Sequence, residues 1–128
     1  MRVVLDASAL LAALLKEPGA SRVGVALDAA IISAVNVAEV VAGIVRNGAS
    51  EREARAVIRA LAMTVVPADE ELAIDAGLIR PITDRVGLSL GDRFCLALAR
   101  RVGSPALTTD RSWTKISEAL GIEIELIR

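Results

Sequence analysis

Five short, largely apolar segments alternate with helical patterns, and this alternation constrains the fold more than any other feature. The segments are residues 3–5, 30–33, 64–67, 106–108 and 122–126. Short runs of this kind are typical of strands that are buried on both faces of a sheet. Because they alternate with helices, they predict an α/β fold: an α/β/α sandwich around a short, mainly parallel central sheet.

The predicted helices fill the segments between these strands. They span residues 7–15, 35–45, 51–63, 70–79, 90–102 and 112–120, with one more helix ending near residue 27. Ser50 is expected to form a capping box with Glu53, and Asp69 to cap the helix that follows it. Pro81 is expected to kink or end that helix. With no linker and no repeat, the chain is predicted to be a single domain, residues 1–128.

The composition excludes several kinds of protein. The chain has no histidine and one cysteine, Cys95, which excludes an internal disulfide, most zinc sites and any Ser-His or Cys-His catalytic pair. Cys95 is interpreted as a small buried apolar residue. Aromatic residues make up 2% and the net charge is −1, so contact with a nucleic acid must be local or made through a metal.

The chain has a high apolar content but no segment long enough to span a membrane. Hydrophobic residues make up 54% of the chain, but no uncharged run approaches the ~20 residues that a spanning helix needs. Asp6 interrupts the apolar start, which argues against an export signal. We therefore expect a cytoplasmic protein with no membrane association, whose apolar surplus forms an interface with a second copy or a partner.

Four acidic residues give the strongest functional signal. Asp6 and Asp110 follow predicted strands, Asp92 opens a predicted helix, and Glu39 interrupts another. Ligand sites in parallel sheets lie at the carboxyl ends of the strands, where these acids are expected to meet. Each aspartate taken alone is also consistent with an ordinary helix cap, and Asp92 with Ser89 fits a capping box.

Glu39 cannot be interpreted as a helix cap, because it lies in the middle of its helix. It shares a stripe with Asn36 and Gly43, apart from the apolar face of the same helix. The stripe carries no neighbouring charge and is flanked by Ala38 and Ala42. A lone glutamate among small residues fits a cavity wall, although a solvated face is the alternative.

Four carboxylates that converge cannot all stay ionised without a counter-charge. Oxygen ligands without histidine or cysteine suit Mg²⁺ or Mn²⁺. Such ions orient a phosphate, activate a water and stabilise a leaving oxygen, so phosphodiester hydrolysis is the expected reaction. The predicted catalytic and metal-binding residues are Asp6, Glu39, Asp92 and Asp110.

Four motifs in this order resemble those of the PIN-domain ribonucleases, and are most similar to the small VapC toxins of prokaryotic toxin–antitoxin pairs. They are LDASAL at 5–10, SAVNVAE at 33–39, LSLGD at 88–92 and LTTDRSW at 107–113. The resemblance implies a PIN-like α/β/α sandwich and Mg²⁺- or Mn²⁺-dependent endonuclease cleavage of RNA. It also implies a homodimer and inhibition by a cognate VapB-type antitoxin.

The resemblance also implies a role for each matching residue. Asp6 and Asp92 would be the principal metal ligands, with Glu39 and Asp110 completing the set directly or through water. The residues that would donate hydrogen bonds around the site, or equally satisfy nearby backbone, are Ser8, Thr108 and Thr109. The candidates for phosphate contacts are Arg93, Arg100, Arg111 and Lys115. Trp113 is expected to pack in the core.

Three other functions remain open from the sequence. One is an RNA-processing PIN nuclease outside a toxin system, and another is a non-catalytic PIN-fold module that binds protein through the apolar surplus. A phospho-acceptor signalling domain is the third, but it needs an adjacent acidic pair near the first strand. Only Met1 and Arg2 precede that strand. The presence of all four acids favours a nuclease over the binding module.

Overall fold

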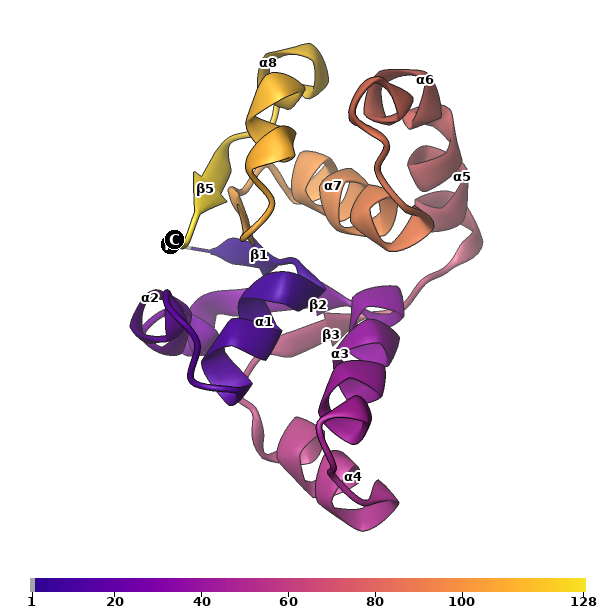
Figure 1. The fold of residues 1–128 in the computed structure, drawn as a ribbon. Coiled ribbons are helices and arrows are strands. Elements are labelled where there is room, and N and C mark those ends of the chain that lie inside the picture. The colour runs from indigo at the N-terminus through magenta and orange to yellow at the C-terminus, as the bar shows by residue number, and fades with distance from the viewer. Residues whose placement is uncertain (1) are drawn as a thin grey trace.

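A computed structural model describes residues 2–128, which form one five-stranded sheet with helices on both faces (Figure 1). The strands are β1 (Val3–Leu5), β2 (Ala30–Ser33), β3 (Thr64–Val66), β4 (Ala106–Thr108) and β5 (Ile124–Leu126). Their order is β3-β2-β1-β4-β5, and every neighbouring pair is parallel. The predicted α/β/α sandwich is confirmed, with a sheet that is wholly parallel.

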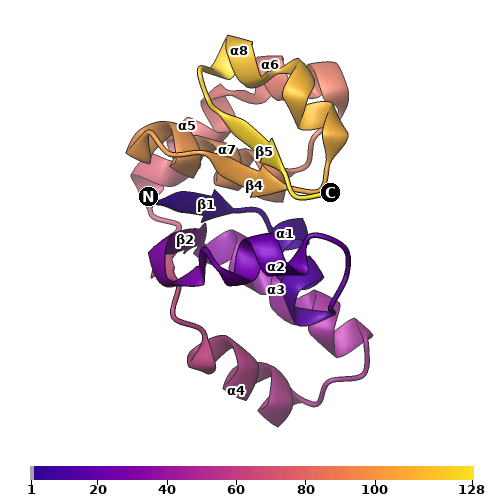
Figure 2. The same cartoon turned by 90° about the vertical axis from the view of Figure 1, so that its left-hand side faces the viewer.

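The helices cover the two faces of this sheet (Figure 2). They are α1 (Ala7–Leu14), α2 (Ala20–Gly24), α3 (Ala34–Arg46), α4 (Glu51–Ala60), α5 (Glu70–Leu78), α6 (Arg80–Thr83), α7 (Leu90–Val102) and α8 (Ser117–Leu120). Three 3₁₀ turns complete the chain: η1 (Leu27–Ala29), η2 (Asp84–Val86) and η3 (Arg111–Lys115). None of the helices within residues 2–128 has the length and apolar character needed to cross a bilayer.

Alternation along the strands divides the core into two layers. Val4 packs with the cluster under α5, α7 and α8, whereas Val3 and Leu5 pack with the cluster under α1 and α2. Ile31 and Ile32 of β2 divide in the same way. Successive residues of a strand point to opposite faces, so strands of three or four apolar residues supply both cores.

Three predicted helices differ from those observed. The helix predicted to end near residue 27 ends at Gly24, and the 3₁₀ turn η1 follows it. The segment predicted as one helix over 112–120 is the 3₁₀ turn η3 followed by α8. Trp113 and Ile116 are both fully buried there, and their spacing of three suits a 3₁₀ turn, in which such residues align. The helix predicted over 51–63 ends at Ala60, because Leu61 is already extended with φ −79° and ψ 139° and leads toward β3.

The strand order places the carboxyl ends of β1 and β4 at a topological switch point. From β1 the chain builds outward through β2 to β3, and then returns to the other side of β1 with β4. Ligand sites in open α/β sheets form where the order reverses in this way. Helix α3 contacts both α1 and α7, so it joins the two halves of the molecule beside this edge (Figure 1).

Candidate functional site

Three of the four predicted acids line one open cavity of about 620 Å³. Asp6 comes from the end of β1, Glu39 from α3 and Asp92 from the first turn of α7. The cavity therefore gathers carboxylates from three elements at the switch point of the sheet. We call it the acid cavity.

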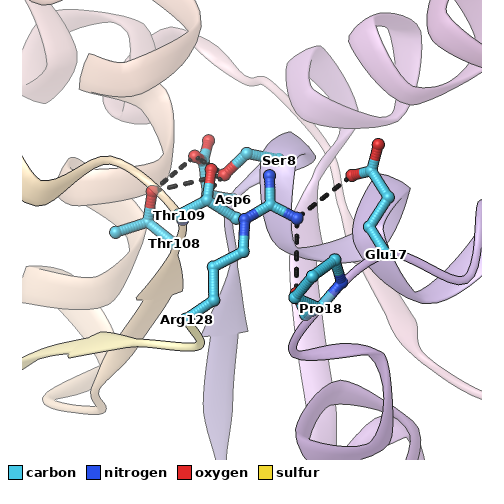
Figure 3. A network of polar contacts seen from close by, with 7 residues as sticks. All are labelled: Asp6, Ser8, Glu17, Pro18, Thr108, Thr109 and Arg128. Atoms are coloured by element: carbon cyan, nitrogen blue, oxygen red, sulfur yellow. Dashed lines mark hydrogen bonds and ion pairs between the residues drawn. The ribbon is translucent and has the colours of Figure 1, made fainter.

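Asp6 is the buried member of the group, with 4% of its surface exposed. Its Oδ2 accepts hydrogen bonds from Ser8 Oγ at 2.6 Å and from Thr108 Oγ1 at 2.8 Å (Figure 3). The same two hydroxyl oxygens accept the backbone N–H groups of Thr109 and Asp110, each at 3.1 Å. Each hydroxyl therefore donates its single proton to Asp6. Through Thr108, strand β4 holds the carboxylate in place.

The environment of Asp6 disfavours its charge. Burial, and secondly the charges of Asp92 and Glu39, raise its pKa to about 6 against the opposing hydrogen bonds from Ser8 and Thr108. A carboxyl group whose pKa is raised by burial and by two neighbouring acids is typical of a functional site.

Glu39 is held by a residue that the predicted site did not include. Asn36 is fully buried, and its Nδ2 donates to Glu39 Oε1 at 2.8 Å and to the carbonyl of Gly91 at 2.9 Å. Gly91 leaves room for this arrangement, because a Cβ at that position would lie 2.5 Å from Glu39 Cδ. The sequence indicated Asn36 only through the helical stripe that it shares with Glu39. The contact between Asn36 and Gly91 depends on tertiary packing and could not be predicted from the sequence.

Asp92 takes part in the N-terminal capping box of α7 and also lines the acid cavity. Its Oδ2 accepts the backbone N–H of Ser89 at 2.9 Å, and Ser89 Oγ accepts the N–H of Asp92 at 3.2 Å. This is the capping box that the sequence allowed. Its Oδ1 receives no hydrogen bond from residues 2–128, and the same holds for Asp6 Oδ1 and Glu39 Oε2. Each of the three acids therefore keeps one oxygen for a ligand.

Asp110 lies outside the acid cavity and acts as a cap. Its Oδ1 accepts the backbone N–H of Ser112 at 2.9 Å and Ser112 Oγ at 2.7 Å, at the start of η3. It reaches the site only through its own N–H, which Thr108 Oγ1 accepts. The structure thus connects all four acids but brings only three of them to one cavity.

The other predicted site residues fall in several places. Ser8 lines the acid cavity, whereas Thr108 is fully buried behind Asp6. Arg111 donates to the C-terminal carbonyl of Arg128 at 3.3 Å. Arg100 lines a separate hollow beside α5. Thr109, Arg93 and Lys115 are likewise absent from the lining of the acid cavity.

The basic residue that does line the acid cavity is Arg46, in the last turn of α3. The predicted phosphate contacts did not include it. The sequence feature that could have identified Arg46 is its spacing: it lies seven residues after Glu39 and therefore on the same stripe of the helix. Trp113 and Cys95 are fully buried, which confirms the interpretation of both as core residues.

The donor chemistry of the acid cavity suits a hard divalent cation. Each lining carboxylate keeps one oxygen without a protein partner, and Asp92 and Glu39 add negative charge beside the buried Asp6, which a cation would offset. As they stand, no three Asp, Glu or Cys side chains within residues 2–128 are arranged to hold a metal ion. Asp92 and Glu39 are instead turned toward Ser89 and Asn36.

Solved structures share this fold over nearly the whole chain. A chain of the DNA-bound VapBC complex from Salmonella typhimurium superposes with a TM-score of 0.75 at 23% identity, covering 100% of this chain and 99% of its own. VapC20 of Mycobacterium tuberculosis, described as a sarcin-ricin loop cleaving toxin, gives 0.70 at 19% identity, covering 88% of this chain and 93% of its own. The DNA-bound VapBC2 of Rickettsia felis gives 0.70 at 14% identity, covering 98% of each chain.

The sequence comparison identifies the family directly. No curated protein matches the chain. The family model of the PIN domain matches residues 3–119, which include all four acids and every strand but the last. The chain belongs to the PIN domain family.

Proposed function

We propose that this protein is a Mg²⁺- or Mn²⁺-dependent endoribonuclease and the toxin of a toxin–antitoxin pair. The observation that carries the proposal is the acid cavity, where Asp6, Glu39 and Asp92 each keep one free carboxylate oxygen. PIN domains are a family of nucleases, and one structural neighbour is described as an RNA-cleaving toxin. The proposed substrate is RNA.

The three carboxylates would hold the cation, and each is oriented by its own neighbours. Ser8 and Thr108 fix Asp6 at the end of β1, and Asn36 fixes Glu39 against α7. A bound divalent ion supplies an activated water and stabilises the oxygen that leaves the phosphate. In this proposal Asp92 and Glu39 keep their present partners with one oxygen each and turn the other oxygen toward the cation.

Asp110 has an indirect role in this proposal. Its N–H holds the Thr108 hydroxyl oxygen, and that hydroxyl donates to Asp6. Its carboxylate caps η3 and so fixes the loop after β4. Asp110 therefore supports the ligand set from behind, or joins it through water.

The proposed protein partners are a VapB-type antitoxin and a second copy of the chain. An apolar hollow of about 410 Å³ lies between α3 and α4, and its lining includes Val41, Val45 and Ile58. Val45 is 47% exposed, so part of this apolar lining is open to solvent. Helix α4 packs chiefly on α3 and extends away from the sheet (Figures 1 and 2). The proposed location is the cytoplasm.

Cleavage of RNA by the purified protein tests the reaction. We expect cleavage with Mg²⁺ or Mn²⁺, loss of cleavage with a chelator, and loss of cleavage in Asp92→Asn. Asp84→Asn is the matched control, because Asp84 is a half-exposed acid paired with Arg80 outside the acid cavity. Cleavage that persists in chelator, or in Asp92→Asn, contradicts the proposal.

A non-catalytic binding module is the second candidate, favoured by one observation. The carboxylates are not yet arranged around a common point. The two functions differ in their response to Mn²⁺ alone: a nuclease shows a Mn²⁺-dependent rise in Tm, and a module shows none. A toxin is further distinguished from an RNA-processing nuclease by growth arrest on expression and by relief of that arrest when a cognate antitoxin is co-expressed.

A further inference from the structure

The acid cavity extends beyond the carboxylates along helix α3. Glu39, Ala42, Gly43 and Arg46 all line it, at spacings of three, four and seven residues that place them on one stripe of the helix. A helix rises 1.5 Å per residue, so the backbone of Arg46 lies about 10 Å along α3 from that of Glu39. Between the two charged residues the wall is apolar, and Leu11 of α1 completes it.

Close packing keeps this apolar wall in place. A Cβ at Gly43 would lie 2.7 Å from Leu11 Cδ2, so α1 and α3 approach closely at this position. The wall therefore belongs to two closely packed helices, whose packing fixes its shape.

Arg46 has no partner in the described chain. Its side chain makes no ion pair and no hydrogen bond with residues 2–128, although it lines the same cavity as three carboxylates. Some arginines are paired, as Arg22 is with Glu125, and others such as Arg100 are not; Arg46 differs from both groups because it lines the acid cavity. A free guanidinium at the edge of a cavity is available to a ligand, and its planar N–H groups suit a phosphate.

We infer that Arg46 binds the RNA phosphate next to the one being cleaved, and that Leu11, Ala42 and Gly43 contact the nucleoside between the two phosphates. The inference rests on the proposed nuclease function. Single-stranded RNA carries one phosphate per nucleotide, so a strand with one phosphate at the carboxylates presents its neighbour along the cavity. Three acids repel that second phosphate, and Arg46 is the cation in the lining that offsets the repulsion.

The first test compares Arg46→Ala with Arg100→Ala. Both arginines are exposed and lie near the end of a helix that carries a site acid, but Arg100 lines a different hollow. Binding of a short, labelled, single-stranded RNA pool of mixed sequence is measured by anisotropy in EDTA, and cleavage of the same pool in Mn²⁺. We expect Arg46→Ala to weaken binding and raise KM about tenfold with kcat nearly unchanged, since a charge-assisted hydrogen bond is lost.

The dependence on salt separates a phosphate contact from a structural effect. The slope of log Kd against log salt should fall by about 0.7 in Arg46→Ala, the value for one phosphate on a single strand. Arg46→Lys should restore the slope, because the charge is kept. Arg100→Ala should match the wild type in Kd, KM and slope.

The second test addresses the apolar wall. Ala42→Glu places a carboxylate between Glu39 and Arg46 and should raise KM, whereas Ala73→Glu, at an exposed alanine within α5, should not. A wild-type Tm in each variant shows that the fold is intact.

The outcomes distinguish this inference from the proposed function. If the wild type cleaves RNA and Arg46→Ala matches it, or if Arg46→Ala and Arg100→Ala weaken binding equally, the subsite is wrong and the nuclease stands. If the wild type neither binds nor cleaves RNA, both are wrong.

Discussion

The side-chain amide of Asn36 lies 2.9 Å from the backbone carbonyl of Gly91, and this hydrogen bond ties helix α3 to the first turn of α7. The other amide proton goes to Glu39. One buried side chain thereby sets the position of Glu39 relative to Asp92, which follows Gly91 in the chain. The Oδ1 of Asn36 has no partner among the described residues, a cost in stability that is expected where a group is kept for its position.

Replacing Asn36 should loosen the acid cavity. We expect Asn36→Ala to lower the free energy of unfolding by about 2 kcal/mol, because a buried carbonyl and a carboxylate lose their donor. It should also weaken Mn²⁺ binding, measured by calorimetry without RNA. Asn47→Ala is the control, because Asn47 also donates to a carbonyl of α3, that of Gly43 at 2.9 Å, but is exposed. An Asn36→Ala protein with wild-type Mn²⁺ affinity contradicts this role.

A methyl group at position 91 should displace Glu39. The added Cβ would lie 2.5 Å from the Glu39 carboxyl carbon, so Glu39 must leave its place beside Asn36. Gly91→Ala is expected to reduce cleavage and Mn²⁺ affinity, even though alanine favours a helix. Gly77→Ala, within α5, meets nothing within 4 Å and should be neutral or stabilising by up to about 1 kcal/mol. Equal behaviour of the two variants would rule out the steric argument.

The metal-free protein should lose stability as the pH rises through the titration of Asp6. Its pKa is raised from 3.8 to about 6, so the folded state binds the proton more tightly than the unfolded state does. This penalty is absent below about pH 3.8, grows as the pH rises, and reaches about 3 kcal/mol above pH 6. Urea unfolding in EDTA at pH 4.5 and 7.5 measures it.

Asp6→Asn provides the comparison for this experiment. Asparagine keeps an acceptor for Ser8 and Thr108 but cannot ionise, so the advantage of the variant over the wild type should be about 2 kcal/mol larger at pH 7.5 than at pH 4.5. A wild type and variant that show the same pH dependence would mean that Asp6 titrates normally.

Replacing Asp110 should affect stability more than metal binding. The side chain caps η3, so Asp110→Ala is expected to lower the free energy of unfolding by about 1 kcal/mol. Mn²⁺ affinity should fall much less than in Asp92→Asn, because Asp110 lies outside the acid cavity. A loss of Mn²⁺ binding as large as that in Asp92→Asn would instead show that Asp110 is a direct ligand.

The parts of the fold that sequence predicted were those with local causes. The bounds of α7 follow from the Ser89 capping box at its start and from Gly103, whose φ of 66° favours glycine, at its end. The short strands follow from apolar runs that have no helical period. The segment after Asp110 was predicted as one helix because burial of Trp113 and Ile116 depends on the distant core, which no local pattern reports.

The members of the candidate site that sequence predicted are likewise those marked by a local sequence feature. Asp6 is marked by its place after a strand, and Glu39 by its isolation within a helix. The bond from Asn36 to Gly91 joins residues 55 positions apart, and it depends on how α3 and α7 pack. The direction in which Asp110 faces is decided by Ser112, a neighbour that competes for its carboxylate.

The two hydroxyls that converge on Asp6 have a consequence for ion selectivity. Both donate to Oδ2, so Oδ1 is the oxygen of Asp6 left free of hydrogen bonds, and the carboxylate would offer the proposed cation a single oxygen of fixed direction. Calcium commonly takes both oxygens of a carboxylate at longer distances, whereas magnesium takes a single oxygen in a tight octahedron. A divalent ion held by this single free oxygen at the end of a β-strand would therefore be the small one in preference to the large one, before any substrate arrives.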